Sequence, residues 1–231
     1  IYTHSSYFDA LDLCLEQIDK LNITYDIYLI SDTEYKHYKT LIYNNSDSYT
    51  NRLVSVIDKL PEYFIFMHED MIPYSHINNK IIDVYFKSML SMQKFDNNIL
   101  SLILIMSGVN IIDYTKKLFN TLYYIPELTP NYKFALQTSI IYGPNFKKVL
   151  SKYLNKTIWE FESELNNQPS IGFTNLVHWD KDLENRRGGH YDSNIFPYMA
   201  TAIVKGKWNS EYKKELISLK DEDFFNIRGW T

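Results

Sequence analysis

Residues 63–73, with the sequence YFIFMHEDMIP, determine how the rest of the chain is interpreted. Four apolar or aromatic residues in a row are typical of a short strand that is buried on both faces. The strand then delivers His68, Glu69 and Asp70 at its end, shortly before Pro73. Two adjacent carboxylates at the end of a core strand repel each other, so this segment predicts a site as well as a strand.

Composition places the chain among ordinary globular proteins. At 231 residues, with 45% hydrophobic and 23% charged side chains, it fits a single domain spanning residues 1–231. The net charge of −4 argues against a nucleic-acid partner. The longest apolar run, residues 99–106, is far shorter than the ~20 residues of a membrane span.

The cysteine content and the first residue bear on where the protein acts. Cys14 is the only cysteine, which excludes an intrachain disulfide and a thiolate metal cage and favours the cytoplasm, or the host cytoplasm for a viral protein. Because the sequence begins at Ile1, we also expect it to be a domain excised from a longer protein.

Strand and helix patterns alternate along the chain. Alternation with unbroken apolar strands predicts an α/β fold, a mixed but mostly parallel sheet flanked by helices. In such sheets ligands bind beyond the carboxyl ends of the strands. The predicted strands are 23–32, the opening of 63–73, 99–107, 121–125, 134–143 and 199–208. One predicted helix carries Phe8 to Ile18 and is capped by Ser5 or Ser6, and another carries Ile77 to Met92 and is capped by Ser75. The other predicted helices are 53–60, 144–154, 157–165 and 210–219.

Glu69 and Asp70 are the candidates for a metal site. Mg²⁺ and Mn²⁺ take one or two carboxylate ligands from the protein and complete their shell with substrate phosphates. The structural alternative is that one acid caps the helix near Ser75, where negative charge suits the helix dipole.

Three earlier segments are candidates for nucleotide contacts. Thr3, His4 and Ser5 form a polar loop before a helix, where backbone amides meet phosphate or ribose. Asp32 ends the predicted strand 23–32 and is either a base or ribose contact or a turn residue. Arg52 either reaches a diphosphate or is a surface arginine.

Residues 157–164, TIWEFESE, carry the candidates for a general base. Thr157 and Glu160 have the spacing of a capping box, which is a sufficient structural account of Glu160. An acid beside a tryptophan at a helix start is also a suitable base, because desolvation raises its pKa toward working pH. Glu160 and Glu162 lie about 200° apart on a helix, so only one faces a given substrate. Glu160 is the preferred candidate.

Residues 186–198, RRGGHYDSNIFPY, suggest a loop that closes over a nucleotide. Gly188 and Gly189 give flexibility, and His190 is a candidate metal ligand. The alternative is that His190 is an ordinary surface or packing residue.

Four motifs, YFIFMHEDM, FALQTSIIYGPNFKKVL, TIWEFE and PYMATAIVKGKW, resemble those of small viral and bacterial glycosyltransferase domains with the GT-A, Rossmann-like fold. The group that builds capsid glycans in large algal viruses is one example. The resemblance implies that Asp70 matches the last acid of the family's Asp-x-Asp metal motif. His68 stands at the first aspartate, where it departs from the pattern, and is a further candidate metal contact; Glu69 partly compensates. It further implies His190 as the late metal ligand and Glu160 or Glu162 as the base.

The function implied by the resemblance is hexosyl or deoxyhexosyl transfer from a nucleoside-diphosphate sugar, such as a UDP-sugar, to a glycan or other hydroxyl acceptor. It implies dependence on Mn²⁺ or Mg²⁺ and a single displacement with inversion. One alternative is a non-catalytic nucleotide- or glycan-binding module on the same fold. The other is a sugar-phosphate nucleotidyltransferase, although YTHSSYF lacks the Gly-rich, Arg-containing loop that usually opens that family.

Overall fold

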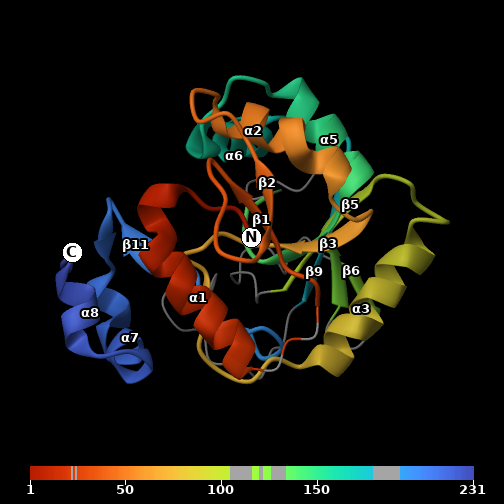
Figure 1. Ribbon diagram of the computed structural model, residues 1–231. Helices are drawn as coiled ribbons and strands as arrows, with labels where there is room; N and C mark the ends of the chain where they lie inside the picture. The colour runs from red at the N-terminus through yellow and green to blue at the C-terminus, as the bar shows by residue number, and fades with distance from the viewer. Residues whose placement is uncertain (22, 24, 105–115, 120–121, 126–133, 179–192) are drawn as a thin grey trace.

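The computed structural model describes residues 1–231 except 22, 24, 105–115, 120–121, 126–133 and 179–192, and it shows a mixed α/β fold (Figure 1). In chain order the described elements are η1 (Ser5–Tyr7), α1 (Phe8–Lys20), β1 (Tyr28–Ser31), β2 (Lys39–Ile42), α2 (Tyr49–Val56), η2 (Ile57–Lys59), β3 (Tyr63–Phe66), β4 (Ile72–Pro73), α3 (Asn79–Met92), β5 (Ile99–Ile103), β6 (Lys116–Phe119), β7 (Leu122–Ile125), β8 (Ser139–Tyr142), α5 (Gly143–Lys152), α6 (Ile158–Asn167), β9 (Thr174–His178), β10 (Tyr198–Met199), β11 (Ile203–Val204), β12 (Lys207–Trp208), η3 (Ser210–Tyr212), α7 (Lys213–Leu219) and α8 (Glu222–Asn226).

The largest sheet has six strands in the order β3-β8-β5-β9-β7-β6. Only β5 and β9 pair in parallel, and the other four pairs are antiparallel. The prediction of a mostly parallel sheet is therefore wrong for this sheet. Helices on both faces bury a strand whatever its direction, so the apolar run in β8 carried no information about strand direction.

The amino-terminal residues join this sheet to β1 and β2. Tyr2 bridges Ile30 on one side and His68 on the other, both in parallel, with Tyr2 N–H donating to Met67 O at 2.9 Å and Thr3 N–H to Ile30 O at 2.9 Å. β1 also pairs with β2 in parallel. β1 and β2, which come next in the chain, therefore lie on one side of residues 1–3, and β3 lies on the other side. This reversal is a topological switch point, where ligands bind at the carboxyl ends of the strands.

Helices cover both faces of the sheet. In Figure 1, α2, α5 and α6 gather at the top of the view, α1 and α3 lie on either side below them, and α7 and α8 lie beside α1. Phe66 and Ile141 belong to the core under α2, α5 and α6, whereas the adjacent Met67 and Ile140 belong to the core on the α1 and α3 side. This alternation is the period of two that strands impose. Among the described helices, none is long and apolar enough to cross a bilayer.

Several predicted helix starts are displaced. A 3₁₀ turn, η1, precedes α1, and its cap is His4 rather than Ser5 or Ser6. The cap of α3 is Asn78, whose side chain accepts from Ile81 N–H, and not Ser75. α5 and α6 begin where predicted, with Pro144 in the first turn of α5.

Three predicted strands are shorter than expected or divided. The predicted strand 23–32 is limited to Tyr28–Ser31, and 134–143 to Ser139–Tyr142. The predicted strand 199–208 is instead the end of β10 followed by the β11–β12 hairpin. Its turn residues Lys205 and Gly206 have φ of 51° and 79°, as a tight two-residue hairpin requires.

Candidate functional site

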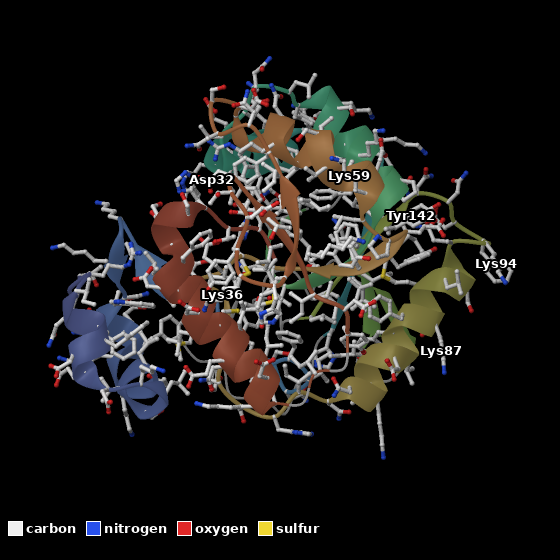
Figure 2. All side chains as sticks on the ribbon, viewed as in Figure 1. Asp32, Lys36, Lys59, Lys87, Lys94 and Tyr142 are labelled. Carbon is white, nitrogen blue, oxygen red and sulfur yellow. The ribbon has the colours of Figure 1, made fainter. Side chains whose placement is uncertain are left out.

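The loop after residues 1–3 holds Asp32 at the end of β1. Ser5 N–H donates to Asp32 Oδ1 and the Ser5 hydroxyl to Oδ2, both at 2.7 Å, and His4 Nε2 lies 3.6 Å from Oδ2. Burial alone would raise the pKa of Asp32, but the hydrogen bonds from Ser5 and the nearby His4 lower it overall. Figure 2 shows Asp32 beside the start of α1. The structure thus brings together three of the predicted nucleotide-contacting residues around a charged carboxylate.

Arg52, on α2, lies next to this carboxylate group. Its Nη2 donates to the Asn45 carbonyl at 2.6 Å and to Asn45 Oδ1 at 3.1 Å, and its Nη1 donates to the Tyr2 hydroxyl at 3.3 Å. Its guanidinium lies 4.8 Å from the centre of the Tyr43 ring. Asn45 Oδ1 is also 3.1 Å from His4 Nε2, so it links His4 to Arg52. The sequence analysis did not identify Asn45; its position in the polar loop after β2 was the available signal.

Thr3 has a supporting position. It is fully buried, its hydroxyl donates to His4 O at 3.4 Å, and its carbonyl accepts from the Tyr43 hydroxyl at 2.8 Å. These contacts fix the loop that carries His4 and Ser5.

His68 lies at the same edge of the sheet, packed among aromatic rings. Its Nε2 is 3.0 Å from the Tyr49 hydroxyl, and the rings of Tyr2 and Phe66 meet it edge-on. Burial lowers the pKa of His68 to about 3, so the imidazole is neutral. His68 is one of the predicted metal contacts, and in the structure its Nε2 bonds to the Tyr49 hydroxyl.

Glu69 and Asp70 follow His68 as a buried pair of carboxyls. Burial raises the pKa of Asp70 to about 7, although hydrogen bonds from its own amide and that of Ile203 oppose the rise. Burial and the neighbouring Asp70 raise the pKa of Glu69 well above its usual range. Among the described residues, no lysine or arginine forms an ion pair with either carboxylate.

This pair fits a hard divalent cation, which relieves the repulsion between the two carboxylates. The part of the chain that the structure describes contains no group of three His, Cys, Asp or Glu side chains for a metal. A cation held here would therefore take its remaining ligands from a substrate or water. His190, the other predicted ligand, lies outside the described residues.

Glu160 and Glu162 have opposite environments on α6. Glu160 closes a capping box: its Oε2 accepts from Thr157 N–H at 2.8 Å and from the Thr157 hydroxyl at 2.9 Å. These hydrogen bonds lower the pKa of Glu160, and it lies in solvent, so the expectation that desolvation raises its pKa is wrong. Burial does raise the pKa of Glu162, whose Oε1 accepts from Leu136 N–H at 2.6 Å.

The segment before β8 carries Glu162 to the same edge of the sheet. β8 pairs Ser139 with Phe66, so residues 136–138 lie beside His68. Gln137 Oε1 accepts from the Tyr198 hydroxyl at 2.9 Å, and the Tyr198 hydroxyl oxygen accepts from Thr138 N–H at 3.3 Å. The sequence analysis quoted this segment as a motif but assigned no role to Gln137, because it was taken as part of the strand.

An apolar cavity of about 280 Å³ runs along β1 and β3. Its walls include Ile1, Tyr28 and Tyr63, which open residues 1–3, β1 and β3. No lysine or arginine is among the described residues that line it, so it lacks a cationic side chain for a diphosphate. The carboxyl edge, not this cavity, holds the candidate site.

No protein-family profile and no curated protein matches this sequence. Among solved structures the chain is similar to UDP-glucose pyrophosphorylase, both in its apo form and in complex with UDP-glucose. In each case the identity is 12% and the TM-score 0.41, over 74% of this chain and 78% of the other. Likeness at this level carries no argument about activity.

Proposed function

We propose that the protein is a glycosyltransferase that moves a sugar from a nucleoside-diphosphate sugar to a hydroxyl acceptor with the help of Mn²⁺ or Mg²⁺. One observation carries the proposal. The Asp32 group, the Glu69–Asp70 pair and Glu162 lie along one edge of the sheet, at the carboxyl ends of β1 and β3 and beside the start of β8. This order matches a nucleotide, its diphosphate and the acceptor of a transfer reaction.

The nucleotide end rests on Asp32 and Arg52. Asp32 is an acceptor for ribose hydroxyls or for N–H groups of a base, held in place by Ser5. Arg52 supplies positive charge beside it, and its side chain is fixed by Asn45 and Tyr2.

Asp70 and Glu69 would hold the cation in this proposal, with Asp70 as the direct ligand. A cation there supplies charge stabilisation for the departing diphosphate. His68 remains a neutral packing residue beneath the acids, which accounts for a histidine at the position of an expected aspartate.

Glu162 is the proposed base, in preference to Glu160. Its carboxylate removes the proton from an acceptor hydroxyl, whose oxygen forms a bond to the anomeric carbon. The bond from that carbon to the diphosphate oxygen breaks, and its electron pair leaves with the nucleoside diphosphate. Burial suits Glu162 to this step because it brings the pKa closer to neutral pH. Base catalysis of this kind contributes on the order of 10²–10⁴-fold.

The metal site is tested by calorimetric titration with UDP and GDP, with and without Mn²⁺. We expect binding that strengthens at least tenfold with Mn²⁺, and an Asp70→Asn variant that loses this gain. Asp223→Asn, an exposed acid on α8, is the matched control and is expected to retain it. Binding that is indifferent to Mn²⁺ and to Asp70→Asn would rule out the metal site.

A second measurement separates the proposal from its alternatives. A transferase releases nucleoside diphosphate from a nucleotide sugar when a hydroxyl acceptor is present. A nucleotidyltransferase instead releases pyrophosphate from a nucleoside triphosphate and a sugar 1-phosphate. Nucleotide binding without either product identifies a binding module.

A further inference from the structure

Trp159 is the most conspicuous side chain near the candidate base. It lies on the first turn of α6 and is 75% exposed. Of the other described tryptophans, Trp208 is fully buried and Trp230 packs against the ring of Phe225. Residues three apart on a helix are surface neighbours, so Trp159 adjoins Glu162. A large amphipathic ring left in solvent beside a half-buried acid indicates a contact that the chain alone does not make.

Two unused hydrogen-bonding groups belong to Glu162 and to the segment that Glu162 contacts. Glu162 Oε1 is held by Leu136 N–H, while its Oε2 has no hydrogen-bond partner among the described residues. Gln137, the residue after Leu136, is held through Oε1 by Tyr198, and its amide N–H₂ likewise has no partner in the described part of the chain. The site therefore presents a fixed acceptor, a fixed donor and an aromatic face.

The start of α6 also lies at the carboxyl edge of the sheet. Thr50 N–H on α2 donates to Lys156 O at 3.2 Å, just before α6. The first residue of α2, Tyr49, in turn contacts His68 through its hydroxyl and interacts electrostatically with Glu162. Trp159 is thus on the acceptor side of the proposed reaction centre.

We propose that Trp159, Glu162 and Gln137 form a subsite for a saccharide acceptor. A pyranose has an apolar C–H face that packs on an indole ring and a rim of hydroxyls that both donate and accept hydrogen bonds. Glu162 accepts from one hydroxyl and Gln137 donates to another. The inference rests on the proposed function and specifies the class of acceptor.

The surroundings of Trp159 favour a saccharide over a protein partner. Ser163 is its other neighbour one turn along the helix, and Asn155 precedes the helix; both are polar and exposed. A stable protein interface buries about 800 Å² on each partner around an apolar centre. Trp159 and Leu154, the exposed large apolar side chains of the described segment 150–167, are too few to form such a centre.

The test is a titration without nucleotide, using the methyl glycosides of glucose, galactose, mannose and rhamnose at up to ~50 mM. We expect at least one to shift the indole N–H resonance of Trp159, assigned by its loss in Trp159→Phe. In Trp159→Ala the acceptor KM in the transfer assay should rise about tenfold, with UDP affinity and the urea midpoint of unfolding unchanged. Phe95→Ala, which removes a ring that is 91% exposed in the α3–β5 connection, should leave the KM unchanged.

The outcomes separate this inference from the proposed function. Absence of any shift with all four glycosides, or an unchanged acceptor KM in Trp159→Ala, would overturn the saccharide subsite while leaving nucleotide binding intact. Loss of Mn²⁺-dependent nucleotide binding in the wild type would overturn the proposed function. A glycoside-induced shift at Trp159 would still support the subsite in that case, as part of a glycan-binding module.

Discussion

Glu160 and Glu162 show how two acids separated by one residue acquire different chemistry. The capping box uses both the hydroxyl and the amide of Thr157 and holds the Glu160 carboxylate in solvent in its charged form. Glu162 follows the buried Phe161, its carboxylate accepts a hydrogen bond from the segment before β8, and it is largely removed from solvent. The sequence shows the capping spacing, but it does not show which side of α6 faces residues 134–138, so Glu160 was preferred.

The pKa of Glu162 leads to a prediction about stability. Because burial raises this pKa, the folded state holds the proton more tightly than the unfolded chain does. The charged carboxylate therefore costs stability above the folded pKa, and the cost disappears as the pH falls below the unfolded value of about 4.3. Glu162→Gln should raise the free energy of unfolding at pH 7 by up to about 1 kcal/mol, because the amide oxygen still accepts from Leu136 N–H.

Urea unfolding at pH 7 and pH 3.5 measures this effect, and the difference between variant and wild type should vanish at pH 3.5. Transfer activity of Glu162→Gln should fall on the order of 10²–10⁴-fold at pH 7. Glu34→Gln, a change of an exposed acid, is the control and should alter neither quantity appreciably. A variant that is less stable than wild type at pH 7 would show that the charged carboxylate stabilises the fold instead.

At the scale of elements, α6 carries two of the three residues of the proposed acceptor subsite, Trp159 and Glu162. Thr157 Oγ1 accepts from Glu160 N–H at 3.3 Å and so completes the capping box. Thr157→Ala should lower the free energy of unfolding by about 1 kcal/mol. Fraying of this turn should also raise the acceptor KM without changing UDP affinity, because Trp159 lies in it and the nucleotide contacts do not.

Ser163→Ala is the matched control for this prediction, since Ser163 is an exposed residue in the middle of the same helix, with a 3.4 Å contact to the Asn167 side chain. It should change the free energy of unfolding by less than about 0.5 kcal/mol. Chemical denaturation and initial-rate kinetics of the wild type, Thr157→Ala and Ser163→Ala test this prediction. Equal losses in the two variants would mean that the capping box does not stabilise α6.

The sequence predicted elements where local signals are strong. Pro144 marks α5, Thr157 with Glu160 marks α6, and the aromatic run before His68 marks β3. Strand ends were less predictable, because 134–138 is as apolar as a strand, yet Phe134 and Leu136 donate their backbone N–H groups to side chains of α6. Strand direction was not predictable, since pairing partners are distant in the chain and β8 is buried in either direction.

For the site, the sequence identified residues at strand ends but not their partners. Ser5 and Asp32, two separate candidates for nucleotide contact, meet because parallel neighbours end at the same edge of the sheet. Asn45 and Gln137 were not identified as site residues because each acts through a contact that only the fold creates, with Arg52 and with Tyr198. The partner of His68 was not predictable for the same reason, since Tyr49 comes from α2.

At the scale of the whole molecule, the carboxyl-terminal segment is tied to the loop that holds Asp32. Arg228 donates through Nε and Nη2 to the two carboxylate oxygens of Asp9, at 2.9 Å and 2.5 Å. Its Nη2 also donates to Ser6 O at 2.8 Å, and its Nη1 to Gly206 O at 3.1 Å. One side chain therefore joins the last residues, the β11–β12 turn and the start of α1, next to Ser5 in the nucleotide loop.

This arrangement predicts that Arg228→Ala destabilises the fold by about 2–3 kcal/mol, because it leaves Asp9 and two carbonyls without their largely buried partner. The free energy of unfolding of Arg228→Lys should lie between those of Arg228→Ala and the wild type, since an ammonium keeps the charge but not the bidentate geometry. Lys220→Ala, which breaks an exposed ion pair with Glu16, should cost less than about 1 kcal/mol. Urea unfolding of the three variants, with UDP affinity measured in parallel, tests the link. If Arg228→Ala matches Lys220→Ala in stability and UDP affinity, the carboxyl-terminal segment does not support the nucleotide loop; a larger loss in both would show that the two ends of the chain stabilise one site.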